Sequence, residues 1–216
     1  MPWAAVQRSY LDESTPPVVV IDNLLTPPAI DALRTLVTEA TVFTDGRPWG
    51  GVGARIGKGL CSHALLRVAR ELSDALPNVL CGRALKSAWA FKYDQASGSR
   101  PGGGIGLHAD AAAVNLNLWI AEDDASGATS GGLRIWPGRA PDSWPFESFQ
   151  DVDAIRSFLG ASKPQLVAHR PNRLVLFDSS LFHQTDPGTF RPGYLNRRVS
   201  LTMLFGRRGE SCLHDS

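Results

Sequence analysis

The pattern of hydrophobic and polar residues changes character near residue 80. Before this point, the β-branched run TPPVVVIDNLL (15–25) predicts a strand. In TPPAIDALRTLVTEA (26–40), a threonine and two prolines precede apolar residues at helical spacing, and this order predicts a helix. A second, amphipathic helix is predicted over SHALLRVARELSDAL (62–76), and Pro77 ends it.

After residue 80 the apolar runs are short, and glycine, proline and polar residues separate them. The runs are ALKSAWAFKYD, AAVNLNLWIA, LRIWPG, QLVAHRPN, RLVLFDSSLFHQT and RRVSLTMLFG. Many short strands between turn signals are typical of a sandwich or barrel. Residues 140–164 depart from this pattern, since they are rich in aromatic residues and contain one predicted helix, DVDAIRSFL. We expect this segment to be an insertion that covers one end of the barrel.

These patterns predict a mainly β fold with flanking helices. A chain of 216 residues, 43% of them hydrophobic, has the size of one domain. We therefore expect residues 1–216 to form a single domain. In it, a strand and helical support region at 1–80 packs on a β core at 81–206.

Charge and composition argue against several classes of partner. A formal net charge of +1 gives no general field for a nucleic-acid backbone or an anionic membrane. The N-terminus lacks a basic stretch followed by an apolar region, and nowhere do eighteen uncharged apolar residues follow one another. We expect a cytoplasmic protein. Cys61, Cys81 and Cys212 are too few for a disulfide framework, so we expect them to be reduced, with the first two packed as small apolar groups.

Histidine and aspartate stand two positions apart in LHADAAAVNLNLWI (107–120). Because residues i and i+2 of a strand project from one face, His108 and Asp110 are placed to bind one metal ion. His183 follows an apolar run and precedes a polar loop, so we expect it where a strand leaves the core. Two histidines and one carboxylate are the ligand set of non-haem Fe(II) oxygenases, which favours iron over zinc. The other histidines are His63 at a helix start, His169 near a proline, and His214 in the tail.

A second signal lies in NRRVSLTMLFG (196–206). Strand alternation puts Arg198, Ser200 and Thr202 on one face and Arg197 on the other. A guanidinium in such an apolar segment needs an anionic partner, since an unpaired buried charge costs several kcal/mol. The planar fork of Arg198 suits a carboxylate. A β-bulge would exchange the roles of the two arginines.

Taken together, four motifs resemble the signature of the 2-oxoglutarate- and Fe(II)-dependent oxygenases, in particular the prolyl-hydroxylase-like group. They are HAD (108–110), GGLRIWP (131–137), NRLVLFDSSLFHQT (172–185) and RRVSL (197–201). The family pattern is His-x-Asp, a Gly-Gly-x-Leu strand, a second His after a strand, and then an Arg or Lys with Ser or Thr two positions later. All four elements occur in this order. The segment VVVIDNLLTPPAIDALRTL (18–36) also resembles the usual start of these proteins.

The resemblance implies a double-stranded β-helix (jelly-roll, cupin-like) core with N-terminal helices packed on it. It implies that His108, Asp110 and His183 bind Fe(II). It also implies that Arg198, with the hydroxyl of Ser200, holds the distal carboxylate of 2-oxoglutarate. Further cosubstrate contacts are implied for Tyr93 and for Asn115 or Asn117.

Some of these residues have an alternative role in packing. Tyr93 alternates with Phe91 and Trp89, as in an ordinary core strand, and strand amides often satisfy neighbouring backbone. The loop DQASGSRPGGGIG (94–106) is longer and richer in glycine than the family form, which bears on the register of Tyr93. We interpret Trp119 and Trp136 as packing residues rather than a substrate cage.

The resemblance implies hydroxylation as the default activity, with demethylation and desaturation as alternatives. We expect the substrate to be a small metabolite or free amino acid, because the sequence shows no extended groove or basic track. In this reaction 2-oxoglutarate and O2 yield succinate and CO2, with ascorbate as an optional reductant. A prolyl or other side chain of a polypeptide is the second choice of substrate. Two other classes stay open: a cupin-like metal- or ligand-binding module without turnover, and a cupin-type metalloenzyme that does not use 2-oxoglutarate. The oligomeric state is not predicted.

No motif identifies the substrate. We expect the rim of the pocket to come from residues 44–60, the loop at 94–106 and the insertion at 140–164. Arg47, Arg55 and Lys58 are available to an acidic substrate, but we interpret them as solvated loop charges.

Overall fold

The computed structural model describes residues 1–48, 50–93, 104–125, 127, 130–210 and 212. Most of the loop at 94–106, and His214, therefore lie outside the described residues. The helices are α1 (Trp3–Tyr10), α2 (Pro27–Glu39), α3 (His63–Ala75), α4 (Pro77–Leu80) and α5 (Val152–Leu159), with short 3-10 turns η1 (Ile56–Lys58) and η2 (Phe146–Phe149). The strands are β1 (Val18–Ile21), β2 (Asp45–Arg47), β3 (Gly51–Arg55), β4 (Leu85–Tyr93), β5 (Val114–Trp119), β6 (Leu133–Arg139), β7 (Gln165–Val167), β8 (Arg173–Asp178), β9 (Leu181–Thr185) and β10 (Arg198–Phe205).

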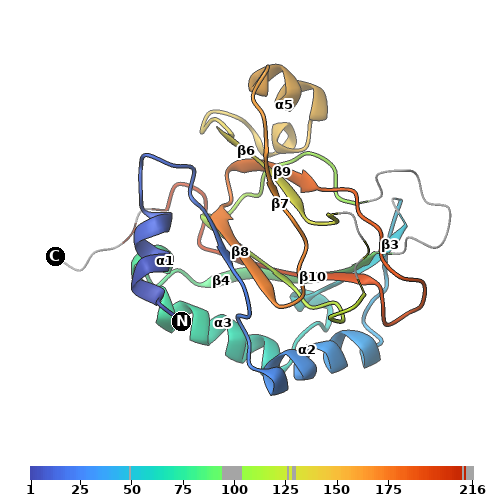
Figure 1. Ribbon diagram of the computed structural model, residues 1–216. Coiled ribbons are helices and arrows are strands. Elements are labelled where there is room, and N and C mark those ends of the chain that lie inside the picture. Colours follow the sequence, from blue (N-terminus) through green and yellow to red (C-terminus); the bar gives the residue numbers. More distant parts are fainter. Residues whose placement is uncertain (49, 94–103, 126, 128–129, 211, 213–216) are drawn as a thin grey trace.

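The strands form two antiparallel sheets that face each other (Figure 1). The larger sheet has the order β1-β8-β5-β10-β4-β3-β2, and the smaller has the order β7-β6-β9. Side chains from the facing surfaces, among them Trp119, Ile135 and Phe177, pack in the space between them. This is the mainly β jelly-roll fold expected from the sequence.

Helices α2 and α3 cover the outer face of the large sheet (Figure 1). Both helices begin as the sequence indicates: Pro27 and Pro28 open α2, and the Ser62 hydroxyl accepts a bond of 3.1 Å from Leu65 N at the start of α3. Their apolar faces pack on alternate residues of β5, β8 and β10 in one core cluster. The N-terminal region therefore supports the sheet from outside.

The insertion at 140–164 lies at one end of the small sheet, with α5 at the top of Figure 1. Phe149 and Ile155 pack against Phe182 of β9 and Leu107 in a third core cluster. Trp136 joins this cluster, and Trp119 is fully buried between the sheets, so both tryptophans pack as expected.

The apolar run RLVLFDSSLFHQT, interpreted above as one strand, is two strands in different sheets. The chain turns after β8 because the Asp178 carboxylate accepts bonds from Ser180 N at 2.9 Å and Ser180 Oγ at 2.7 Å. This turn passes the chain from the large sheet to the small one. His183 consequently lies within β9 rather than at the end of a long strand.

Helix α1, the short helix α4 and the hairpin of β2 and β3 were not predicted. Helix α1 is only eight residues long, and its signal is weak beside that of α2 or α3. The hairpin of β2 and β3 extends the large sheet, with β3 paired to β4. Its glycines and single proline conceal the alternation by which a strand is recognised.

The expectation of three reduced cysteines is wrong, since a disulfide joins Cys81 to Cys212 with their Cα atoms 5.1 Å apart. The cause is the antiparallel pairing of β10 with β4, which matches Phe205 with Leu85. Residues after β10 therefore lie beside residues before β4, although 131 positions separate the two cysteines. Cys61 is exposed rather than packed as a small apolar group.

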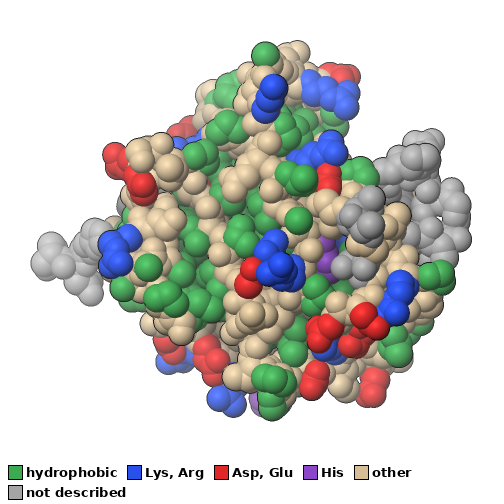
Figure 2. Space-filling model, viewed as in Figure 1, with side chains coloured by type: hydrophobic (Ala, Val, Ile, Leu, Met, Phe, Trp, Pro, Cys, Tyr) green, Lys and Arg blue, Asp and Glu red, His purple; other side chains and the backbone are tan. Residues whose placement is uncertain are grey.

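Charged side chains of both signs are interspersed on the face seen in Figure 2, in keeping with the net charge of +1. Among the described residues, no helix has the length and apolar character needed to cross a bilayer.

Candidate metal and cosubstrate site

Three side chains predicted as metal ligands converge between the two sheets. His108 lies in the segment before β5 and forms a β-bridge with His183: His108 N donates to His183 O at 3.0 Å, and His183 N donates to His108 O at 2.8 Å. Asp110 is held by a bond of 2.9 Å from its N to Ser179 O. One ligand atom from each of the three side chains lies within 4.8 Å of the others. His108 thus belongs to the edge of the small sheet, not to the start of β5 as the alternation had suggested.

Both imidazoles are oriented by backbone carbonyls. His108 Nδ1 lies 2.7 Å from Gly106 O, and His183 Nδ1 lies 2.9 Å from Leu181 O. A carbonyl only accepts, so each Nδ1 carries the hydrogen and each Nε2 presents its lone pair. The Nε2 atoms lie 4.0 Å and 3.5 Å from the two oxygens of Asp110. This donor set fits a divalent transition metal.

The electrostatics of these groups suit metal binding. Burial, together with the neighbouring His183, lowers the pKa of His108 to about 4, which keeps this imidazole neutral at pH 7. Burial acts to raise the pKa of Asp110. The adjacent His183 and His108, together with a bond of 2.7 Å from Asn115 Nδ2, outweigh this effect, so the pKa is lowered. The site therefore holds an ionised carboxylate beside a neutral imidazole.

A narrow cavity runs from these ligands to Arg198, about 20 Å³ in this side-chain arrangement. A dicarboxylate therefore enters only if lining side chains shift. The residues that line it are Trp89, Tyr93, Ile105, His108, Asp110, Asn115, Asn117, Leu133, His183, Thr185, Arg198 and Thr202.

Arg198 lines this cavity and is 1% exposed. Its Nε donates to Gly131 O at 2.6 Å and its Nη2 to Gly132 O at 3.4 Å, while its guanidinium carbon lies 4.2 Å from the centre of the Tyr93 ring. Among the described residues, its buried Nη1 has no hydrogen-bond partner and its guanidinium has no carboxylate partner. A buried guanidinium with such a free donor is a site for an anion.

The pairing of β10 with β4 keeps its register from Arg198 to Leu204, so no bulge exchanges the two arginines. Arg197 instead lies over the ring of Tyr194, with its guanidinium carbon 5.2 Å from the ring centre. Of the pair, Arg198 is the one that lines the cavity.

The remaining predicted residues divide by location. Tyr93, Asn115 and Asn117 all line the cavity, and each amide has a buried Oδ1 without a partner. Ser200 shares the strand face of Arg198 and is buried, but it does not line this cavity. Thr202, two positions further on, does, and its Oγ1 accepts from Asn117 Nδ2 at 3.0 Å. The alternation of β10 puts Thr202 on the same face as Arg198 and Ser200, so the sequence already made Thr202 a candidate beside Ser200.

His169 was missed as part of this region. It is buried, stacks on Trp119 with ring centres 5.1 Å apart, and has no partner for either ring nitrogen. Burial, with the charges of Arg198 and Arg173, lowers its pKa to about 3. The imidazole is therefore neutral and leaves Arg198 without a competing cation.

A second, larger cavity of about 440 Å³ is also lined by His108 and Asp110. Its described lining residues are Arg47, Arg55, Trp89, Phe91, Ile105, Gly106, Leu107, His108, Asp110, Ala111, Phe146, Gln150, Val152 and Leu204. The segments at 44–60 and 140–164 thus both contribute to it, as expected. A space of this size accommodates a small molecule.

The interpretation of Arg47 and Arg55 as solvated loop charges is wrong. They lie on β2 and β3, and their guanidinium carbons are 5.0 Å and 5.8 Å from the ring centres of Phe91 and Trp89, respectively. Lys58 is exposed and does not line the cavity.

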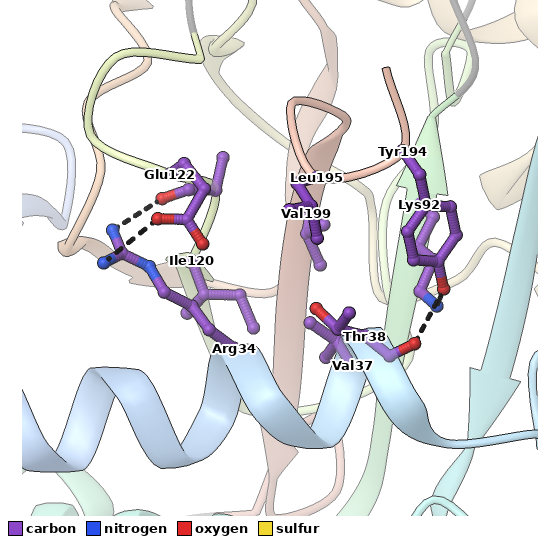
Figure 3. Close-up of a pocket in the computed structure, with 10 residues that line it drawn as sticks. Arg34, Val37, Thr38, Lys92, Ile120, Glu122, Tyr194, Leu195 and Val199 are labelled. Atoms are coloured by element: carbon purple, nitrogen blue, oxygen red, sulfur yellow. Dashed lines mark hydrogen bonds and ion pairs between the residues drawn. The ribbon is translucent and has the colours of Figure 1, made fainter.

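A further small pocket lies between α2 and the outer face of the large sheet (Figure 3). There the Lys92 Nζ donates to Tyr194 Oη at 2.6 Å, and Tyr194 Oη donates to Thr38 O at 2.9 Å. The Lys92 Nζ also lies 3.8 Å from the centre of the Phe43 ring. With a volume of about 20 Å³, this pocket has room only for a water-sized group.

No family model and no curated protein matches this sequence. Several solved structures, however, match it in fold. A prolyl-4-hydroxylase from Pseudomonas putida is 20% identical, with a TM-score of 0.58 over 97% of this chain and 100% of that one. SnoN, a non-haem α-ketoglutarate-dependent epimerase of nogalamycin biosynthesis, is 16% identical, with a TM-score of 0.64 over 94% and 84% of the two chains. HygX from Streptomyces hygroscopicus, solved with nickel, 2-oxoglutarate and hygromycin B, is 12% identical, with a TM-score of 0.60 over 92% and 85%. The chain therefore has the fold of the 2-oxoglutarate- and Fe(II)-dependent oxygenases, including their prolyl-hydroxylase-like group.

Proposed function

We propose that this protein is a non-haem Fe(II)- and 2-oxoglutarate-dependent dioxygenase that hydroxylates a small metabolite or free amino acid. His108, Asp110 and His183 would hold the iron through two Nε2 atoms and a carboxylate oxygen. Three of six coordination positions then remain for the cosubstrate and O2. When bound, Fe(II), 2-oxoglutarate and O2 supply the oxidation that yields succinate, CO2 and the hydroxylated product.

The observation that carries this proposal is the unpartnered Nη1 of the buried Arg198. The same cavity is lined by this arginine and by the three candidate iron ligands. A ligand that fills this cavity needs one group for the metal and a carboxylate for the guanidinium, and 2-oxoglutarate has both. A module that binds metal alone would have no use for a buried, incompletely paired arginine.

The surrounding side chains support the same assignment. Tyr93 lies under the Arg198 guanidinium and fixes its plane. Asn115 donates to Asp110 and so orients this carboxylate toward the imidazoles. The free Oδ1 atoms of Asn115 and Asn117 are acceptors at the cavity wall.

The test is anaerobic addition of Fe(II) and 2-oxoglutarate, followed by the weak visible charge-transfer band of the chelate. We expect the band in the wild-type protein and in His63→Ala, whose histidine is exposed on α3, and its loss in His108→Ala. A wild-type protein without the band contradicts the proposal. A band without succinate release in air would instead indicate a binding module. Activity that survives Arg198→Ala would indicate an enzyme that does not use 2-oxoglutarate.

We further propose that residues 1–216 act as one domain and that it works in the cytoplasm. Because the cytoplasm is reducing, the Cys81–Cys212 disulfide would persist in it only if cellular reductants do not reach the two sulfur atoms.

A further inference from the structure

The larger cavity is lined both by cations and by two of the candidate iron ligands. Arg47 and Arg55 line it together with His108 and Asp110. Apart from Asp110, no described lining residue is acidic. A molecule in this cavity therefore meets two guanidiniums while one of its bonds faces the metal centre.

The two guanidiniums share a single carboxylate. Asp45 forms an ion pair with Arg47, and its Oδ2 lies 3.5 Å from Arg55 Nε. With two guanidiniums and one carboxylate, the β2–β3 hairpin carries one positive charge in excess. The Nε of Arg47 is in addition a buried donor that no described residue uses.

Aromatic rings on β4 support both arginines. Arg47 lies over Phe91 and Arg55 over Trp89, and stacking of this kind orients a guanidinium while its in-plane donors stay available to a carboxylate. The Phe91 ring lies against the backbone of Gly53, where a Cβ would come within 2.5 Å of Phe91 Cε1. A side chain at position 53 would therefore displace the Phe91 ring.

The rest of the wall is mostly apolar. Phe146 and Val152 come from the insertion and Leu204 from the inner face of β10, and Gln150 adds one amide. Such a wall suits a hydrocarbon body, not a second charged group.

We propose that the substrate oxidised here is a small organic acid whose carboxylate is bound by Arg47 and Arg55, with its hydrocarbon part between the apolar wall and Trp89. This inference rests on the proposed function and specifies its substrate class. It makes Arg47 and Arg55 specificity-determining residues, whereas a residue inside a polypeptide, which has no free α-carboxylate, would lack this anchor.

The experiment compares acids with their primary amides as stimulants of succinate release from 2-oxoglutarate. The probes are L-proline, N-acetyl-L-proline, L-phenylalanine and 3-phenylpropanoate, each with its carboxamide. We expect at least one acid to raise the rate about fivefold or more above the background without substrate, and its amide to give less than about a tenth of that increase. A panel in which no acid exceeds its amide overturns the proposal.

The matched variants are Arg47→Gln/Arg55→Gln and, as control, Arg139→Gln/Arg170→Gln, which removes two exposed, ion-paired arginines outside the cavity. We expect the first pair to abolish stimulation by the acid and the second to retain it. If the double variant does not fold, the single variants Arg47→Gln and Arg55→Gln are tested in its place. All are first tested for the Fe(II)–2-oxoglutarate band, so that loss of the iron site is distinguished from loss of the acid site. Unchanged stimulation in variants that keep the band overturns the proposal.

Discussion

On the outer face of the large sheet the buried cation is surrounded by partners, whereas on the inner face the buried cation keeps one donor that has no partner among the described residues. Lys92 of β4 points toward α2, where its ammonium group lies beside Tyr194 (Figure 3). The ammonium nitrogen also lies 3.8 Å from the centre of the Phe43 ring. Arg198, paired across the sheet with the adjacent Tyr93, points inward and keeps one unpartnered donor. The two residues are almost equally buried, at 4% and 1% exposed. Completeness of pairing, rather than burial, distinguishes a structural cation from one that awaits a ligand.

The substitution expected to have the largest effect on the inner-face site is Arg198→Gln, and it tests the comparison most directly. Since the variant removes the charge that faces the cosubstrate carboxylate, we expect the KM for 2-oxoglutarate to rise by about 100-fold or more. Arg197→Gln is the control and should change it by less than about threefold, because Arg197 lies over Tyr194. The measurement is succinate release as a function of 2-oxoglutarate concentration. Equal effects of the two variants would show that the inner face has no dedicated anion site.

A second test uses His169, whose two ring nitrogens are buried without a hydrogen-bond partner among the described residues. Its pKa is about 3 in the folded protein against about 6.5 when unfolded, so the unfolded chain binds more protons between these values. The stability contributed by the neutral imidazole is therefore complete above about pH 6.5 and is lost as pH falls toward 3, at up to about 1.4 kcal/mol per pH unit. We expect His169→Phe to flatten this dependence in urea unfolding between pH 7 and 5. The exposed His63→Phe should leave it unchanged.

The smallest effect on 2-oxoglutarate binding is expected from a substitution on the outer face of the large sheet. Lys92→Met keeps the apolar stem but removes a hydrogen bond and a cation–π contact, so we expect a loss of about 1–2 kcal/mol in the free energy of unfolding. The KM for 2-oxoglutarate should stay within about twofold of the wild type. A Lys92→Met protein that binds 2-oxoglutarate as poorly as Arg198→Gln would remove the distinction between the two faces.

The residues predicted best from the sequence are those with a local signature. His108 and Asp110 stand two positions apart, and Arg198 lies in a strand whose alternation is regular. Local patterns also located α2, α3 and α5.

What the sequence did not predict depends on contacts between distant segments or on weak local signals. The β2–β3 hairpin has no visible alternation, so Arg47 and Arg55 looked like loop charges until their pairing with β4 was known. The turn at Asp178 divides one apolar run between two sheets, which a hydrophobic pattern alone does not reveal. Thr202 could be distinguished from Ser200 only by the shape of the cavity.

The disulfide between Cys81 and Cys212 turns residues 81–212 into a covalent ring. Every proposed iron and cosubstrate residue lies inside this ring, while α2 and α3 lie outside it. A protease that cuts the ring once produces two polypeptides that remain linked and separate only after reduction. The support helices, by contrast, are released by a single cut before residue 81 as soon as their noncovalent packing fails.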